Sequence, residues 1–86
     1  MDAKTILGLN LRRLRVERGY SQERLALDAG IDRAYVGRIE RGSENVTIAR
    51  LEALATILQV PVAALFAEPA DHKPPALRPG RKPKAR

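Results

Sequence analysis

One stretch, residues 21–42, constrains the fold most, because helix start and stop signals alternate in it at short intervals. Ser21 and Asp32 suit the N-cap position, since their side-chain oxygens can accept the free backbone N–H groups of a first helical turn. Gly30 and Gly42 stand where each helix has to end, and glycine readily takes the left-handed conformation that commonly follows a helix. The stretch therefore predicts two short helices with a tight turn between them.

The two predicted helices cover residues 22–29 and 33–41, and each has a narrow apolar face. The apolar positions are Leu25, Ala26, Ala29, Val36 and Ile39, with Ile31 in the corner. Two helices of about two turns each, joined by a glycine-bearing turn, match the helix-turn-helix motif. A basic outer face with small residues lets the second helix sit deep in the DNA major groove. The residues predicted on that face are Arg33, Ala34, Gly37, Arg38 and Arg41.

Three more helices are predicted on either side of this pair. Apolar residues at helical spacing predict a first helix over 4–18 and a fourth over 48–58. Pro61 suits the first position of a short fifth helix over 61–66, because its missing N–H would be unpaired there anyway. The predicted fold class is therefore all-α, with five helices around a core of aliphatic side chains.

The composition changes towards the end of the chain, which has 86 residues and a formal net charge of +6. We interpret residues 1–66 as one domain and residues 67–86 as a flexible basic tail that holds five of the six prolines. A segment with so little apolar pattern cannot bury enough surface to offset the entropy of ordering it. Its cations could follow DNA phosphates, and the alternative is a tail that only aids solubility.

The residues that the chain lacks argue against a disulfide, a metal or catalytic site, and a membrane span. It has no cysteine and one histidine, His72, so we expect no disulfide, no metal site and no cofactor. It holds no catalytic-looking Ser/His/Asp set and no glycine-rich phosphate loop, so we expect no enzymatic activity. No small-molecule effector is evident either. No apolar run approaches the roughly 18 residues of a membrane span, and a secretory signal is missing. We expect a cytoplasmic protein.

Taken together, residues 6–66 resemble the phage-repressor-like helix-turn-helix domain of the Cro/C1, or XRE, type. The residues that carry the resemblance are Leu11, Leu14, Arg15, Ser21, Gln22, Leu25, Ala26, Gly30, Ile31, Val36, Ile39, Glu40, Gly42, Leu51, Leu54, Val60 and Leu65. The resemblance implies a lambda-repressor-like fold and a transcription regulator of bacterial or phage origin, associated with the nucleoid. It also implies sequence-specific binding of double-stranded DNA by a homodimer at an inverted repeat, with the third helix in the major groove.

Two shorter runs are similar to the controller proteins of restriction-modification systems, which are also single small domains. They are DRAYV at 32–36 and NVTI at 45–48. This chain departs from that pattern at Ala34, where controllers often carry a hydroxyl residue, and at Glu44, where a basic residue can stand.

The resemblance and the side-chain chemistry together predict the DNA contacts. By resemblance, Gln22 hydrogen-bonds a phosphate at a helix N-terminus, which attracts anions. Arg33 can reach guanine O6 and N7 with both arms of its guanidinium, and Tyr35 can bond or press on the DNA backbone. The alternative is a solvated side chain, or for Tyr35 packing against the preceding helix. Glu44 is expected to repel DNA unless it accepts from a cytosine amine. The expected DNA-binding residues are Gln22, Arg33, Ala34, Tyr35, Gly37, Arg38, Arg41, Ser43 and Asn45.

Two further groups of residues are expected to be structural. By resemblance, Arg15 and Glu40 form a partly buried ion pair that links the first helix to the third. Apolar residues at the end of the fourth helix and on the fifth are expected to join two copies of the chain, and the alternative use, which can coexist, is closure of the core. These residues are Leu58, Val60, Val62, Leu65 and Phe66.

Two other functions remain open from the sequence. One is an antitoxin or adaptor whose fold binds a protein, with DNA binding secondary. The other is a non-specific nucleoid protein driven by the basic tail, which the differentiated third helix disfavours. The operator, the regulated genes and the choice between repression and activation cannot be derived from these residues.

Overall fold

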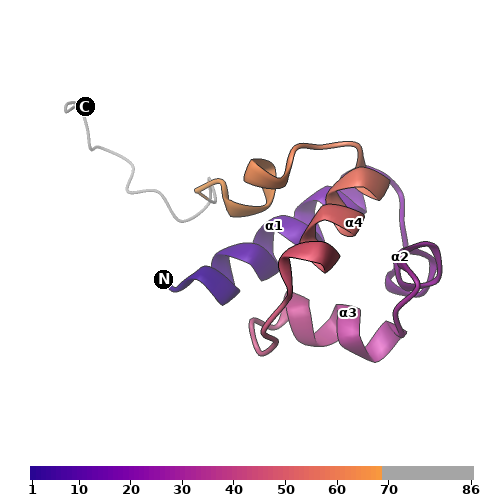
Figure 1. The fold of residues 1–86 in the computed structure, drawn as a ribbon, viewed down its shortest axis with the longest axis horizontal. Helices are drawn as coiled ribbons and strands as arrows, with labels where there is room; N and C mark the ends of the chain where they lie inside the picture. The colour runs from indigo at the N-terminus through magenta and orange to yellow at the C-terminus, as the bar shows by residue number, and fades with distance from the viewer. Residues whose placement is uncertain (69–86) are drawn as a thin grey trace.

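The computed structural model describes residues 1–68, which form four α-helices and a final 3₁₀ helix around one core (Figure 1). The predicted all-α fold class is confirmed, and residues 1–68 contain no strand. Apart from its first two residues, the predicted tail lies outside the described part of the chain. The elements are α1 (Ala3–Glu17), α2 (Gln22–Ala29), α3 (Arg33–Glu40), α4 (Ile48–Leu58) and the 3₁₀ helix η1 (Val62–Phe66).

Each α-helix begins at a side chain that caps its first turn. Asp2, Ser21, Asp32 and Thr47 each accept a hydrogen bond from the backbone N–H three residues further on, at 2.9–3.2 Å. The two N-caps predicted in the helix-turn-helix are therefore confirmed. Gly30 follows α2 with φ 71° and ψ 29°, the left-handed conformation that ends a helix.

The predicted fifth helix is present as a 3₁₀ helix, and Pro61 precedes it in extended backbone rather than forming its first residue. The backbone N–H of Ala64 donates to the carbonyl of Pro61 at 2.9 Å, which is the i to i+3 bond of this tighter helix. The backbone is extended again at Ala67. A segment of five residues is too short to repay the nucleation of an α-helix.

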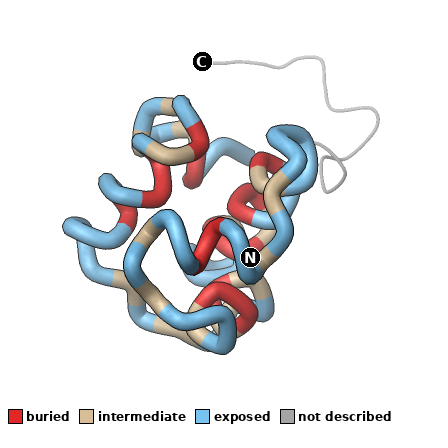
Figure 2. The backbone as a smooth tube through the Cα atoms, turned by 90° about the vertical axis from the view of Figure 1, so that its right-hand side faces the viewer, coloured by how far each residue is buried: buried red, intermediate tan, exposed pale blue. Residues whose placement is uncertain are grey.

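The core consists of aliphatic side chains from every element. Figure 2 marks the buried residues in red along the backbone. The core residues are Leu7, Leu11, Leu14, Leu25, Ala26, Val36, Ile39, Leu51, Leu54, Ala55, Leu58 and Leu65.

Two of the five residues expected at a dimer surface belong to this core. The side chains of Leu58 and Leu65 are 0% exposed, so they close the core of one chain and have no surface to offer a second copy. These two residues therefore take the alternative use, closure of the core, and the dimer surface itself stays a prediction. Val60 and Val62 are half-buried, and Phe66 is 41% exposed.

Helix α1 approaches the end of α3 closely at Gly8. A Cβ atom at this position would lie 2.5 Å from the carbonyl oxygen of Ile39 and 2.7 Å from that of Glu40. Any side chain here would push the two helices apart, because the atoms it meets belong to backbone. The contact sets the distance between α1 and α3, and therefore helps to position the helix-turn-helix.

The buried polar side chain of Asn10 joins α1 to the end of η1. It is 1% exposed, and its amide nitrogen lies within hydrogen-bond distance of the carbonyl oxygens of Ile6, Leu65 and Ala67, at 3.1, 3.1 and 2.7 Å. Its amide oxygen accepts from Arg13 at 3.0 Å. Asn10 thus satisfies backbone carbonyls that a short 3₁₀ helix leaves free.

Candidate nucleic-acid interface

The outer face of α3 is set by the burial of its inner face. Val36 and Ile39 are 0% and 1% exposed in the core, and the turn before α3 is fixed by a 3.0 Å bond from the Ile31 backbone N–H to the Ala26 carbonyl. The residues on the other side of α3 fall into two groups, which lie on different flanks of the helix. The sequence predicted Arg38 on the same face as Arg33, Ala34, Gly37 and Arg41, and weighed Tyr35 separately.

The first group surrounds an open hollow between the start of α2 and the outer face of α3. The hollow has a volume of about 330 Å³, and five of the nine expected DNA-binding residues line it: Gln22, Arg33, Ala34, Gly37 and Arg41. Arg33, Ala34 and Arg41 are exposed. At Gly37 a Cβ would meet only the Arg41 side chain, at 3.3 Å. The hollow therefore combines two cations with a floor of small residues.

The carboxylate of Glu40 forms an ion pair with a side chain of α1 and accepts a hydrogen bond from a side chain of α2. Arg15 donates to it from Nε at 2.6 Å and from Nη2 at 3.2 Å, and also donates to the Tyr20 carbonyl at 2.8 Å. The amide of Gln22 donates to the same carboxylate at 3.0 Å. The Arg15 and Glu40 side chains are 11% and 6% exposed. The structure thus brings the two predicted ion-pair partners together and adds Gln22 to them.

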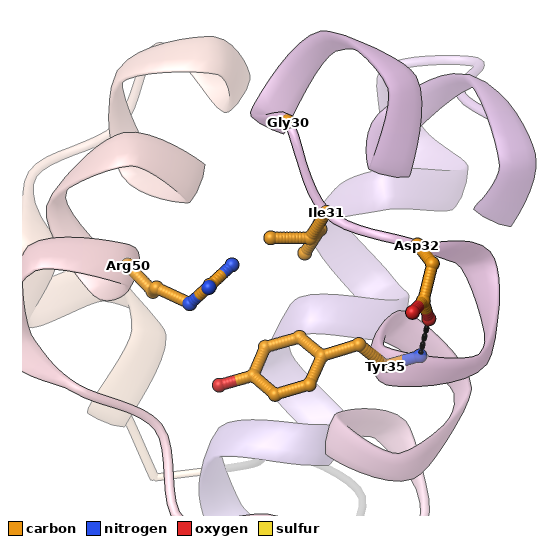
Figure 3. A pocket seen from close by; sticks show the side chains of 5 residues that line it. All are labelled: Gly30, Ile31, Asp32, Tyr35 and Arg50. Carbon is orange, nitrogen blue, oxygen red and sulfur yellow. Dashed lines mark hydrogen bonds between the residues drawn. The ribbon is translucent and has the colours of Figure 1, made fainter.

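The second group is centred on the ring of Tyr35. The Arg38 guanidinium lies 5.5 Å from the ring centroid, and its Nε donates to Glu44 at 2.7 Å. Arg50 reaches the same ring from α4, at 5.0 Å (Figure 3). Both distances fit cation–π contacts. Tyr35 is half-buried beside the core.

Glu44 changes the charge of this second group. The hydrogen bond from Arg38 to Glu44 raises the pKa of Arg38 further above its already high value, so the guanidinium stays charged. Its charge is nevertheless offset by the carboxylate 2.7 Å away. Repulsion of DNA was the expected role of Glu44, but the structure gives this carboxylate an arginine partner within the protein.

The remaining predicted residues lie in the loop after α3. Ser43 donates to the Arg38 carbonyl from both its backbone N–H, at 3.0 Å, and its hydroxyl, at 3.1 Å. Asn45 is exposed. Sequence reasoning missed Arg50, because nothing in the linear pattern shows that the first turn of α4 faces Tyr35.

A second open hollow, of about 320 Å³, lies beside Tyr35 between the helix-turn-helix and α4. Figure 3 shows Arg50 extending from α4 towards Tyr35, with the Asp32 cap bonded to the Tyr35 backbone N–H. Within residues 1–68 there is no cluster of three or more histidine, cysteine or acidic side chains able to hold a metal ion. In the same range, none of the helices has the length and apolarity that crossing a bilayer would require.

A family model and several known proteins match most of this chain. A family model described as helix-turn-helix matches residues 11–65. A hypothetical transcription factor of Neisseria meningitidis is 38% identical over 68 residues, which are 79% of this chain and 64% of that protein. The chain therefore spans a little under two thirds of that relative.

Two solved structures are similar in both fold and sequence. The restriction-modification controller protein C.AhdI from Aeromonas hydrophila has a TM-score of 0.71 and 44% identity, covering 73% of this chain and 96% of that one. SinR, a master regulator for biofilm formation solved in complex with DNA, has a TM-score of 0.67 and 35% identity, covering 71% and 98%. SinR of Bacillus subtilis is also found among the sequence relatives.

Proposed function

Because this chain belongs to the phage-repressor-like (XRE) helix-turn-helix family of DNA-binding transcriptional regulators, we propose that it reads an inverted-repeat operator as a homodimer, with α3 in the major groove. The family is one of regulators rather than enzymes. The observation that carries the proposal is the hollow beside α3, where Arg33 and Arg41 flank the small residues Ala34 and Gly37. A helix with so few bulky side chains on its outer face can approach the base edges closely.

Each residue of the hollow has a role in this proposal. Arg33 donates both arms of its guanidinium to a guanine, Ala34 contacts a thymine methyl group, and Arg41 bonds a phosphate. An amide nitrogen carries two hydrogens, so Gln22 can donate one to Glu40 and the other to a phosphate. The bond to Glu40, at 3.0 Å, orients the Gln22 amide before DNA arrives. In the following loop, Ser43 and Asn45 are within reach of the DNA backbone as it leaves the groove.

A homodimer would place two copies of α3 about one turn of DNA apart, roughly 34 Å, on the two halves of a palindrome. The surface available for such a dimer is the end of the domain around η1, where Val60, Val62 and Phe66 keep exposed apolar area. The similarity to C.AhdI supports a narrower role as the controller of a restriction-modification system.

The test is selection of random duplex DNA by the purified chain at about 150 mM salt, where weak phosphate binding is screened. We expect enrichment of an inverted repeat. Arg33→Ala should then lose discrimination at one base pair of each half-site, by about 1–3 kcal/mol.

The matched control is Arg12→Ala, which removes an exposed arginine on α1 and should select the same motif as the wild type. The proposal is overturned if no motif is enriched. It is also overturned if Arg33→Ala selects the wild-type motif with wild-type affinity.

A further inference from the structure

Arg38 is the arginine of α3 that pairs, within residues 1–68, with a carboxylate of the loop after the helix. Its Nε donates to Glu44 at 2.7 Å, while its guanidinium lies over the Tyr35 ring at 5.5 Å. The side chains of Arg38 and Glu44 are 43% and 24% exposed. Arg33 and Arg41, by contrast, line the open hollow on the other flank of the helix.

The position of Glu44 is fixed by the same turn of α3 that carries Arg38. Ser43, the residue before it, donates twice to the carbonyl of Arg38, so the loop cannot move away from the helix without breaking both bonds. The ring of Tyr35 is held in turn by its half-buried position beside the core and by Arg50. Carboxylate and ring are therefore in place before DNA binds, and the guanidinium is oriented by both.

We propose that Glu44 is a positioning residue for DNA reading, which holds Arg38 on Tyr35 and keeps its charge from binding phosphates at random. This inference rests on the proposed DNA-binding function. A guanidinium has five N–H groups, and Glu44 engages the one on Nε, so the four on the terminal nitrogens can still donate to the DNA. Arg38 then adds affinity only for DNA sequences that place an acceptor in the one position its guanidinium can reach. At other sequences its charge is offset by Glu44.

The proposal predicts a definite change in the salt dependence of binding. In Glu44→Gln the released Arg38 is free to neutralise phosphate. For each phosphate gained, the slope of log affinity against log salt steepens by about 0.9, or roughly threefold in affinity between about 50 and 200 mM salt. Affinity for a shuffled duplex should rise by more than affinity for the operator, so the ratio between them falls.

A carboxylate near DNA could also act by direct repulsion, and a double-mutant cycle separates the two effects. The cycle compares wild type, Glu44→Gln, Arg38→Ala and the double variant on the selected operator and a shuffled duplex of equal length. If Glu44 acts through Arg38, the change caused by Glu44→Gln disappears in the Arg38→Ala background. Direct repulsion would give the same change in both backgrounds, and that result overturns the proposal.

The control variant is Glu52→Gln, which removes an exposed carboxylate on α4 and leaves the ratio of operator to shuffled affinity unchanged. A readout without DNA is the NMR exchange rate of the Arg38 Nε hydrogen with water. We expect it to be slow in the wild type and faster in Glu44→Gln. Equal rates overturn the proposal.

The outcomes for the inference and for the proposed function can be told apart. A wild-type protein that binds operator and shuffled duplex equally overturns the proposed function and this inference together. A wild type that discriminates, with a Glu44→Gln variant of unchanged ratio and slope, overturns the inference alone.

Discussion

Glu40 is the residue at which three helices meet. Its carboxylate belongs to α3 and accepts hydrogen bonds from Arg15 of α1 and Gln22 of α2. A nearly buried carboxylate is costly unless its oxygens are satisfied, and here three donors satisfy it. The same bonds tie α2 and α3 to α1. They act together with the core packing and the close contact at Gly8 in positioning the helix-turn-helix.

Replacing Arg15 with methionine should lower the free energy of unfolding by about 3–5 kcal/mol, because Glu40 is left as an unpaired buried charge. The measurement is chemical or thermal unfolding followed by circular dichroism. Arg24→Met is the matched control. Arg24 pairs with Asp28 at 3.2 Å, but its side chain is 63% exposed, so the loss there should be within about 1 kcal/mol. An Arg15→Met variant that melts with the wild type would show that the pair has no structural role.

At the scale of elements, the helices could be predicted well because their signals are local. The predicted bounds of α2 and α4 agree with the structure, and those of α1 and α3 differ by one residue. N-cap side chains and left-handed glycines act within one turn of the chain, so they can be identified before the fold is known. The state of η1 could not be predicted in this way, because its end is held by Asn10, over fifty residues away.

In the candidate site, too, the residues set by local signals could be predicted and those set by tertiary contacts could not. Local periodicity placed Arg33, Ala34 and Gly37 on the outer face of α3, and the structure brings them together with Gln22. Local periodicity did not separate Arg38 from Arg33, Ala34 and Gly37, and this has a physical reason. The direction of the Arg38 side chain depends on its partners, the Glu44 carboxylate and the Tyr35 ring. The positions of the loop that carries Glu44 and of that ring are defined only in the folded chain.

The close contact between α1 and α3 at Gly8 can be tested by substitution. Gly8→Ala should destabilise the fold by about 1–3 kcal/mol, because overpacking forces the backbones to shift, although alanine is the better helix former. Gly37→Ala is the matched control within another helix, since its Cβ would meet only the flexible end of Arg41. That variant should be as stable as the wild type or slightly more so. Equal thermal stability of all three proteins would contradict the close contact at Gly8.

At the scale of the whole molecule, the local pairing of charges matters more than the net charge. Residues 1–67 carry ten basic and eight acidic side chains, a small excess for a protein proposed to bind DNA. The carboxylates of Glu40, in α3, and Glu44, in the loop after it, are bonded to arginines. Within residues 1–68 neither Arg33 nor Arg41 forms a salt bridge, and both line the hollow that is proposed to meet the phosphate backbone.

The proposed dimer makes a prediction that can be checked without DNA. Phe66→Ser should weaken self-association by roughly tenfold or more, because apolar anchors supply most of the binding energy at an interface. Sedimentation at several protein concentrations measures this directly. Leu27→Ser is the matched control, since Leu27 is 69% exposed on α2, away from η1. A wild-type chain that stays monomeric at every concentration, with and without its operator, would refute the dimer.

The bonds around Glu40 also bear on how a lineage of such proteins can diverge. A mutation at Arg15 or Glu40 alone leaves the partner's charge buried and unpaired. Selection is expected to eliminate such a mutant before a compensating change can arise. Arg33 and Ala34 lie outside the core and can drift one at a time without loss of folding. Under the proposed reading of DNA by Arg33 and Ala34, descendants of this chain are therefore expected to change operator in single mutational steps, while the three-helix junction is inherited unaltered.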